Sequence, residues 1–253
     1  MTQIDSTDRR RGPDPVWALV PVKRLDDAKR RLASHLRPFE RQRLCRAMLE
    51  DVLATLSKCE RIDGVTVVSD DDEVAALARR YACEHLPERE LGVRGLNGVV
   101  SAAVSRLAER GVASVMVVHG DLPMLTPGDV ASLLDSHAVL QEPSVTIATD
   151  RHRSGSNCVL ASPAATFEFC FGEDSLARHL EVARNRGVKA AVAELPGTSL
   201  DVDTPEDLAA LLREIGLQQG SHTGRCLRSF EWWPPANDLP QDPGQRAVHC
   251  RSE

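Results

Sequence analysis

Short apolar runs alternate along this chain with longer stretches in which apolar residues recur every three or four positions. The runs are typical of buried strands and the recurring pattern of amphipathic helices, so their alternation predicts an α/β protein with a mostly parallel sheet and helices on both faces. The expected strands are 16–20, 64–68, 83–86, 115–118, 144–149, 158–161 and 188–195. The expected helices are 38–57, 69–80, 99–110, one from 127, 175–185 and 205–215.

The run 115–118 organises the expected sheet. Four apolar residues in a row predict a strand buried on both faces, and Asp121 follows its carboxyl end, where open α/β sheets bind ligands. A second extended run at 198–203 is expected to bring Asp201 and Asp203 to the same edge, on one side of the backbone. Grouped carboxylates suit Mg²⁺, so the pattern predicts a magnesium site at these three aspartates. Asp201 is a stronger candidate than Asp203, which directly precedes a helix cap, and a turn-forming role for Asp121 is the alternative.

Two of the expected helices carry the same start signal. Thr126 and Thr204 each precede a proline and stand three residues before an aspartate. This is the arrangement of an N-cap, a first helical residue and a capping-box partner. The run from Ser69 to Glu73 is expected to cap another helix and to place acidic residues in its first turn, and we interpret the three aspartates at 70–72 as an N-cap cluster rather than as metal ligands.

The segment 22–32 is basic in an otherwise acidic chain, since five of its eleven residues are Lys or Arg. Lys23, Lys29 and Arg31 follow the first expected strand, at the place where many nucleotide-binding folds have a glycine-rich phosphate loop. Because this chain has no such glycine pattern there, side-chain charge is expected to hold the phosphates. A solvated basic helix face is the alternative interpretation.

Length and composition predict one domain at 16–216. The chain has 253 residues, 42% of them hydrophobic, which is enough for a large core without disulfides. Residues 1–15 are polar and are expected to form a disordered lead-in. Residues 217–253 show no periodicity, contain Trp232 and Trp233, and are expected to form a disordered tail.

Charge and cysteine content exclude several classes of protein. A formal net charge of −6 argues against a nucleic-acid binder, because neutralising phosphates requires a basic surface. The seven cysteines are scattered and form no C-x-x-C pair, so neither a disulfide framework nor a zinc site is expected. Without an apolar stretch near eighteen residues or a signal-like start, the chain is expected to be cytoplasmic, with no membrane partner.

The candidate chemistry is metal-assisted displacement at phosphorus. No Ser-His-Asp or Cys-His set stands out, so covalent catalysis is not indicated. His119 is expected to be a satisfied core residue of the central strand. Positioning and charge stabilisation would then do most of the catalysis.

Six motifs, taken in order, resemble the CofC family of phospholactate guanylyltransferases, which act in the biosynthesis of coenzyme F-420. The similarity covers roughly residues 16–215. The motifs are Val20 to Leu32 with its lysines, Gly95-Leu96-Asn97, Gly120-Asp121-Leu122-Pro123, Asp150 to Asn157, Phe171-Gly172 with Asp174-Ser175, and Asp201 to Leu208.

The resemblance implies a single-domain, Rossmann-like nucleotidyltransferase that uses GTP and a small phosphorylated carboxylic acid and releases diphosphate. It implies that Asp121 and Asp201 hold Mg²⁺, the cofactor. The residues expected to be catalytic are Lys23, Lys29, Asp121 and Asp201. Those expected to bind substrate are Ser156, Gly172, Ser175, Asn97 and Arg31.

Several alternatives stay open at this point. The acid is 2-phospho-L-lactate, 3-phospho-D-glycerate or phosphoenolpyruvate, and Arg153, Ser154 and Ser156 depart from the family's usual loop. The assembly is a monomer or a homodimer. A molybdopterin- or sugar-type nucleotidyltransferase and a nucleotide-binding protein without turnover are the rival functions.

Overall fold

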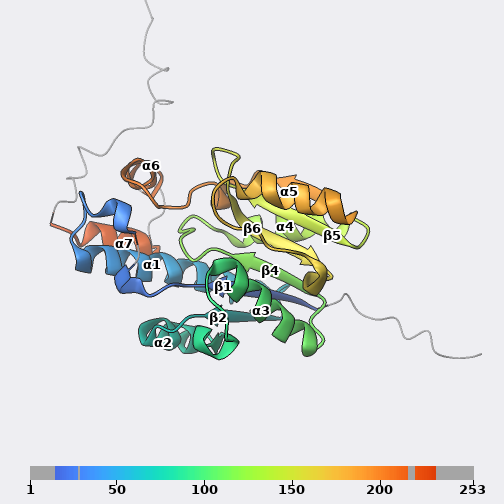
Figure 1. The fold of residues 1–253 in the computed structure, drawn as a ribbon. Helices are drawn as coiled ribbons and strands as arrows, with labels where there is room; N and C mark the ends of the chain where they lie inside the picture. Colours follow the sequence, from blue (N-terminus) through green and yellow to red (C-terminus); the bar gives the residue numbers. More distant parts are fainter. Residues whose placement is uncertain (1–14, 28, 216–219, 232–253) are drawn as a thin grey trace, which may run out of the picture.

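One mixed sheet forms the centre of the protein (Figure 1). The computed structural model describes residues 15–27, 29–215 and 220–231 of the chain. Their seven strands lie in the order β3-β2-β1-β4-β6-β5-β7, and β6 is antiparallel to both of its neighbours. The strands are β1 (Val16–Pro21), β2 (Gly64–Val68), β3 (Glu84–Leu86), β4 (Ser114–Val118), β5 (Ser144–Thr149), β6 (Ser156–Ser162) and β7 (Lys189–Ala193).

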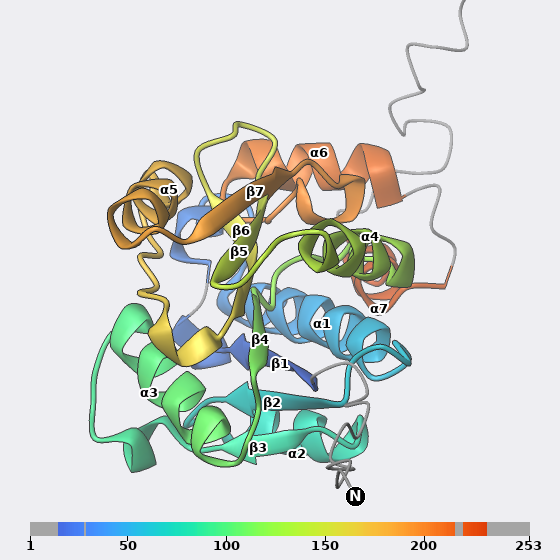
Figure 2. The ribbon, with the colours of Figure 1, turned by 90° about the vertical axis from the view of Figure 1, so that its right-hand side faces the viewer.

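Helices cover both faces of this sheet, as the alternating pattern predicted (Figure 2). The helices are α1 (Pro38–Leu56), α2 (Asp72–Arg80), α3 (Leu96–Glu109), α4 (Pro127–Ala138), α5 (Ser175–Arg186), α6 (Pro205–Ile215) and α7 (His222–Arg228). The buried residues of α3 and α5 belong to the core on one face, and those of the other five helices belong to the core on the opposite face. No helix in the described part of the chain combines the length and apolarity needed to cross a membrane.

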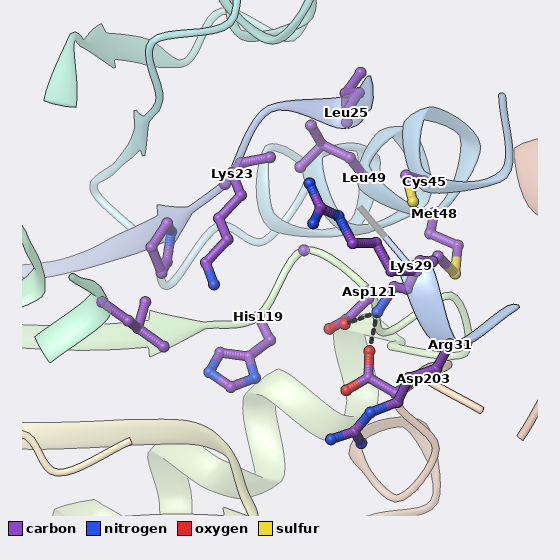
Figure 3. A pocket seen from close by; sticks show the side chains of 15 residues that line it. Lys23, Leu25, Lys29, Arg31, Cys45, Met48, Leu49, His119, Asp121 and Asp203 are labelled. Atoms are coloured by element: carbon purple, nitrogen blue, oxygen red, sulfur yellow. Dashed lines mark hydrogen bonds and ion pairs between the residues drawn. The ribbon is translucent and has the colours of Figure 1, made fainter. Parts of the chain in front are cut away.

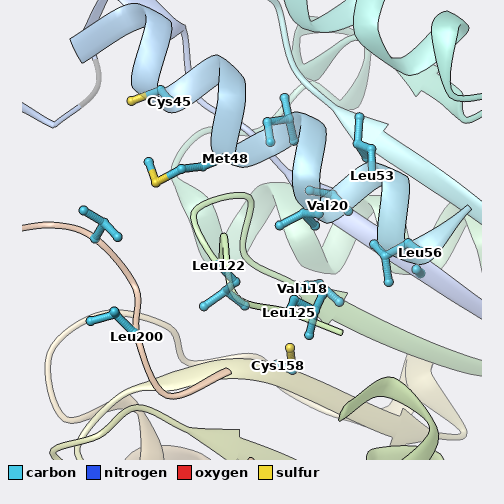
Figure 4. Close-up of a cluster of buried hydrophobic side chains, with 14 of the residues drawn as sticks. Val20, Cys45, Met48, Leu53, Leu56, Val118, Leu122, Leu125, Cys158 and Leu200 are labelled. Carbon is cyan, nitrogen blue, oxygen red and sulfur yellow. The ribbon is translucent and has the colours of Figure 1, made fainter. Parts of the chain in front are cut away.

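The larger core lies between α1 and the centre of the sheet (Figure 4). Met48, Leu53 and Leu56 of α1 belong to one buried cluster with strand residues Val20 and Val118, and each of the five side chains is at most 1% exposed. Burial of such a side chain stabilises the fold by about 1.5–3 kcal/mol. The runs at 16–20 and 115–118 are apolar because they form the central strands of the sheet, whose two faces are both covered by helices.

The strand order reverses at the centre of the sheet. The chain runs from β1 outward to β2 and β3 and then returns to place β4 on the other side of β1. Loops from neighbouring strands diverge at such a switch point and leave a crevice at the carboxyl ends of the strands. The loops that begin at Pro21 and His119 flank this crevice.

The two predicted capping boxes are confirmed. The hydroxyl oxygen of Thr126 accepts a hydrogen bond from the Asp129 N–H (3.2 Å), and that of Thr204 accepts one from the Asp207 N–H (3.2 Å). The predicted cap cluster at 69–73 is also confirmed: the side chain of Asp71 caps α2 and accepts from the Glu73 N–H (2.8 Å).

Two predictions near the sheet edge are corrected. Residues 198–203 do not form a strand: Pro196–Thr198 is a 3-10 helix, and the residues after it pair with no strand of the described sheet. His119 is not a strand residue, since β4 ends at Val118. Asp201 and Asp203 are therefore held by loop contacts rather than by alternation along a strand.

The expected disordered tail is wrong where the structure describes it. Residues 220–231 include α7, which packs against α1 and buries Leu227 (0% exposed) and Phe230 (4% exposed). The carboxylate of Asp51 on α1 accepts hydrogen bonds from the backbone N–H groups of His222 (2.7 Å) and Thr223 (2.8 Å), which fixes the start of α7. The expected lead-in at 1–14 and the stretches 216–219 and 232–253, with the tryptophan pair, lie outside the described residues.

Candidate functional site

A cleft of about 460 Å³ opens at the carboxyl ends of β1 and β4 (Figure 3). Its walls come from the segment after β1, from one face of α1, from the loop after β4 and from Asp203. The polar residues that line it are Lys23, Lys29, Arg30, Arg31, His119, Asp121 and Asp203. The switch point of the sheet therefore brings predicted cations and predicted metal ligands into one cavity.

Lys29 lies at the centre of the polar wall. Its ammonium group forms ion pairs with Asp121 and with Asp203 (2.6 Å), and its side chain is only 8% exposed (Figure 3). Burial opposes the charge of Lys29, but the two carboxylates outweigh it and raise the pKa of the ammonium. Lys29 is therefore a permanent cation that holds Asp121 and Asp203 together.

The carboxylate of Asp121 has one oxygen that is not used. Its Oδ2 pairs with Lys29, whereas its Oδ1 is buried and has no hydrogen-bond partner among the described residues. Burial acts to raise the pKa of Asp121, but the charge of Lys29 overrides this and lowers it, so the carboxyl is ionised. A buried, unpaired anionic oxygen is a suitable ligand for a hard cation.

Asp201 is the third predicted metal ligand, and it is not among the residues that line the cleft. The Asn157 side-chain amide donates to its Oδ1 (3.1 Å). Burial and the negative charges of Asp121 and Asp203 raise the pKa of Asp201, and no described residue forms an ion pair with its carboxylate. In the described residues, no three acidic, His or Cys side chains are grouped closely enough to hold a metal as they lie. The donor chemistry nonetheless fits Mg²⁺, with Asp121 Oδ1 unpaired and Asp201 electrostatically unsatisfied.

The basic segment wraps around the cleft in two short 3-10 turns, Leu25–Asp27 and Arg30–Leu32. Leu25 and Leu32 are buried and anchor these turns. Because the segment is not a regular helix, its interpretation as a solvated helix face is wrong. Lys23 and Arg31 line the cleft and are exposed, and no described residue forms an ion pair with either of them.

A β-bulge directs two residues near the cleft. In the pairing of β5 with β6, Ala148 faces Cys158 but Thr149 faces Ser156, so Asn157 is an extra residue. Such a residue reverses which side chain faces which side of the sheet. Asn157 consequently reaches Asp201, and Ser156 turns to the α5 side.

Ser156 is buried at 1% exposure and contacts His179. The Cys170 N–H donates to His179 Nε2 (2.8 Å), so the ring proton is on Nδ1, which donates to Ser156 Oγ (3.0 Å). Burial lowers the pKa of His179 to about 4, and the ring is therefore neutral. Ser156 thus has its own hydroxyl proton to donate, but the hydroxyl lies beneath the surface rather than in the described cleft.

The other residues expected to bind the acid lie around the same loop. The side-chain amide of Asn97 forms two hydrogen bonds with the backbone of Phe171: its Nδ2 donates to the Phe171 carbonyl (3.1 Å), and its Oδ1 accepts from the Phe171 N–H (2.7 Å). Gly172 has a φ of 119°, a conformation that favours glycine. Ser175 begins α5. Asn97 therefore positions the Phe171 loop and offers no unpaired polar group.

Arg153 points elsewhere. Its guanidinium pairs with Glu194 (3.2 Å), and its side chain is 66% exposed. The structure therefore gives its charge a partner outside the cleft.

His119 is a site residue that the sequence pattern did not identify. It lines the cleft, its ring lies 5.1 Å from the ring of Phe171, and its buried Nε2 has no hydrogen-bond partner in the described part of the chain. The position directly after a buried strand and before Gly120-Asp121 was the signal that could have located it at the cleft.

Two solved structures share the fold of this protein. A putative nucleotide-diphospho-sugar transferase from Desulfovibrio desulfuricans superposes with a TM-score of 0.69 at 18% identity, covering 84% of this chain and 94% of that one. A CMP:2-keto-3-deoxy-manno-octonic acid synthetase complexed with CTP gives 0.55 at 15% identity, covering 81% and 100%. At these identities the likeness establishes the fold alone, a Rossmann-like nucleotidyltransferase architecture.

Sequence comparison identifies the family. A phosphoenolpyruvate guanylyltransferase of Conexibacter woesei is 35% identical over 87% of this chain and 99% of its own length. A 2-phospho-L-lactate guanylyltransferase of Methanothermobacter thermautotrophicus is 34% identical over 85% of this chain and 91% of its own. The family model described as "Guanylyl transferase CofC like" matches residues 16–231, which include α7. The resemblance drawn from the six motifs is thereby confirmed, and the chain belongs to the CofC-like guanylyl transferase family.

Proposed function

We propose that this protein is a guanylyltransferase that joins the GMP part of GTP to a small carboxylic acid bearing a phosphate. The observation that carries the proposal is the cleft itself, which Lys23, Lys29 and Arg31 line together with Asp121 and Asp203, the two carboxylates that pair with Lys29, at the switch point of a nucleotidyltransferase sheet. Cations at this position suit a triphosphate, and the names of the family's relatives supply the guanylyl group and the class of acceptor. Coenzyme F-420 biosynthesis in the cytoplasm is the setting that we propose.

The proposed reaction needs no general base. A phosphate oxygen of the acid attacks the α-phosphorus of GTP, a new P–O bond forms, the bond to the α,β-bridging oxygen breaks, and diphosphate leaves with that electron pair. The attacking oxygen is already anionic, so no proton is removed. The residues must then orient two polyanions against their mutual repulsion, which is the role we assign to Lys23, Lys29 and Arg31.

We propose that Asp121 and Asp201 hold Mg²⁺, with Asp203 as a weaker ligand. Support comes from the buried Oδ1 of Asp121, which has no hydrogen-bond partner among the described residues, and from Asp201, whose pKa is raised by burial and by the charges of Asp121 and Asp203. When bound, Mg²⁺ would neutralise negative charge that develops on the departing diphosphate. His119, between Phe171 and the cleft, is available to donate or accept one hydrogen bond to a substrate oxygen.

A single assay tests the proposal and separates it from its rivals. The protein is incubated with GTP, Mg²⁺ and, in turn, phosphoenolpyruvate, 2-phospho-L-lactate, 3-phospho-D-glycerate and a sugar 1-phosphate. Diphosphate release is measured and the product is identified by mass. Turnover with one of the three acids supports the proposal. Turnover only with the sugar phosphate, or GTP binding without turnover on any acceptor, would overturn it.

A further inference from the structure

A second hollow of about 370 Å³ adjoins the cleft. It lies at the carboxyl ends of β1 and β2, and four of its lining residues, Pro21, Val22, Lys23 and Leu96, also line the first cleft. Its remaining lining residues are Arg24, Val68, Asp70, Glu88, Gly95 and Val99. A ligand that extends from the cleft past Lys23 therefore enters this hollow.

The walls of the hollow suit a flat heterocycle. Val68 and Val99 are buried, and Val22 and Leu96 are partly buried, so they present an apolar surface. The backbone at Gly95 has a φ of 80° and carries no Cβ that would narrow the entrance. The volume is within the range of small-ligand pockets.

Glu88 provides the polar rim of the hollow. The turn that carries it is held by Asp70, whose Oδ1 accepts from the Arg89 backbone N–H (3.0 Å) and from the Arg89 guanidinium (3.4 Å). Among the residues that the structure describes, none donates a hydrogen bond to the Glu88 carboxylate or forms an ion pair with it. Asp70 thus positions the turn, and both carboxylate oxygens of Glu88 remain available to a ligand at a rim that also carries Lys23, Arg24 and Asp70.

The hydrogen-bonding edge of guanine matches such a carboxylate. Guanine presents two adjacent donors, N1–H and the 2-amino group, and an ionised carboxylate accepts from both at once. Adenine presents an acceptor at N1, which a carboxylate repels. We propose that Glu88 selects guanine by accepting hydrogen bonds from N1–H and the 2-amino group, with the base between Leu96 and the valines. This inference rests on the proposed function, since it places the base of the same GTP.

Lys23 indicates which way a bound nucleotide would run. It lines both the cleft and the hollow, and in Figure 3 its side chain extends between β1 and His119. A nucleotide whose base contacts Glu88 would therefore pass its phosphates beside Lys23 toward Lys29 and the carboxylates. The two cavities then correspond to the two ends of one nucleotide.

The variant Glu88→Gln tests the pairing because it replaces one of the two hydrogen-bond acceptors of the carboxylate by a donor. The glutamine carbonyl still accepts from N1–H, but its amide donates and therefore opposes the 2-amino group of guanine. It matches xanthine, which has an oxygen at that position. We expect the parent protein to prefer GTP over ITP, which lacks the 2-amino group, by about tenfold or more. In Glu88→Gln we expect the GTP-over-ITP preference to disappear and XTP to exceed GTP by about tenfold.

Affinities for GTP, ITP and XTP are measured by direct titration with Mg²⁺, and kcat/KM is measured with the acid that supports turnover. The matched control is Glu90→Gln, on the same turn, because Glu90 is 52% exposed, pairs with Arg106 and does not line the hollow. An unchanged GTP preference in Glu88→Gln, or an equal loss for all three nucleotides, would overturn the inference. Failure of turnover with every acid would instead overturn the proposed function, and the titrations would still decide the role of Glu88.

Discussion

Deleting residues 217–253 is expected to destabilise the protein strongly, because the deletion removes α7. Leu227 and Phe230 are almost completely buried against α1, and burial of each is worth about 1.5–3 kcal/mol, or about 3–6 kcal/mol together. A domain of this size has a total stability of about 5–15 kcal/mol. The loss corresponds to a fall in Tm on the order of 10 °C, measured by thermal unfolding.

A shorter deletion, of residues 232–253, is the matched control because it shortens the chain but keeps α7. We expect its Tm to lie much closer to that of the full chain than the Tm of the longer deletion does. The single substitution Phe230→Ala should reproduce about half of the loss, since it leaves the Asp51 contacts to His222 and Thr223 in place. The reasoning would be refuted if both deletions unfolded at the temperature of the full chain, since α7 would then contribute nothing to the core.

Three further changes test individual site residues. Folding raises the pKa of Asp201, so its ionised form destabilises the fold at neutral pH, and this penalty disappears as the pH falls through that pKa. We therefore expect Asp201→Asn to keep or raise the Tm while lowering kcat more than about 100-fold at saturating Mg²⁺, and near-normal turnover would contradict its role as a ligand. Lys23→Ala should raise the KM for GTP about 10- to 100-fold at unchanged Tm, because its side chain is exposed; a change in Tm alone would assign it a structural role. Arg153→Gly should leave the order of preference among the three acids unchanged, since Arg153 pairs with Glu194, and an altered order would show that it reaches the substrate.

Local patterns were sufficient to predict the elements whose contacts are repetitive. The strand at 64–68 and the helix at 205–215 have the expected bounds. Apolar patterns and capping residues depend only on residues that are close together in the sequence. The helix at α7 could not be predicted in this way. It has only seven residues, and besides the local cap, in which Ser221 Oγ accepts from the Gly224 N–H (3.0 Å), its start is held by Asp51, which lies far away in the sequence.

The candidate site was predicted in its composition more than in its geometry. Asp121 and Lys29 do meet at the carboxyl edge of the sheet, as expected from their positions after β4 and β1. Which pairs form was not predictable, because Asp203 reaches Lys29 and Asn157 reaches Asp201 through a loop and a bulge. Glu88 was not identified because its segment carries no motif and the hollow is assembled from three separate parts of the chain.

The ion pairs of Lys29 have a consequence for how the protein responds to metal. Two carboxylates that face one cleft without a cation would repel each other and so destabilise the fold. Here the chain carries its own counter-ion, because Lys29 remains protonated between Asp121 and Asp203. The internal ion pairs therefore let the site keep its arrangement without a metal, and a chelator should leave the Tm of the protein unchanged even if it abolishes turnover.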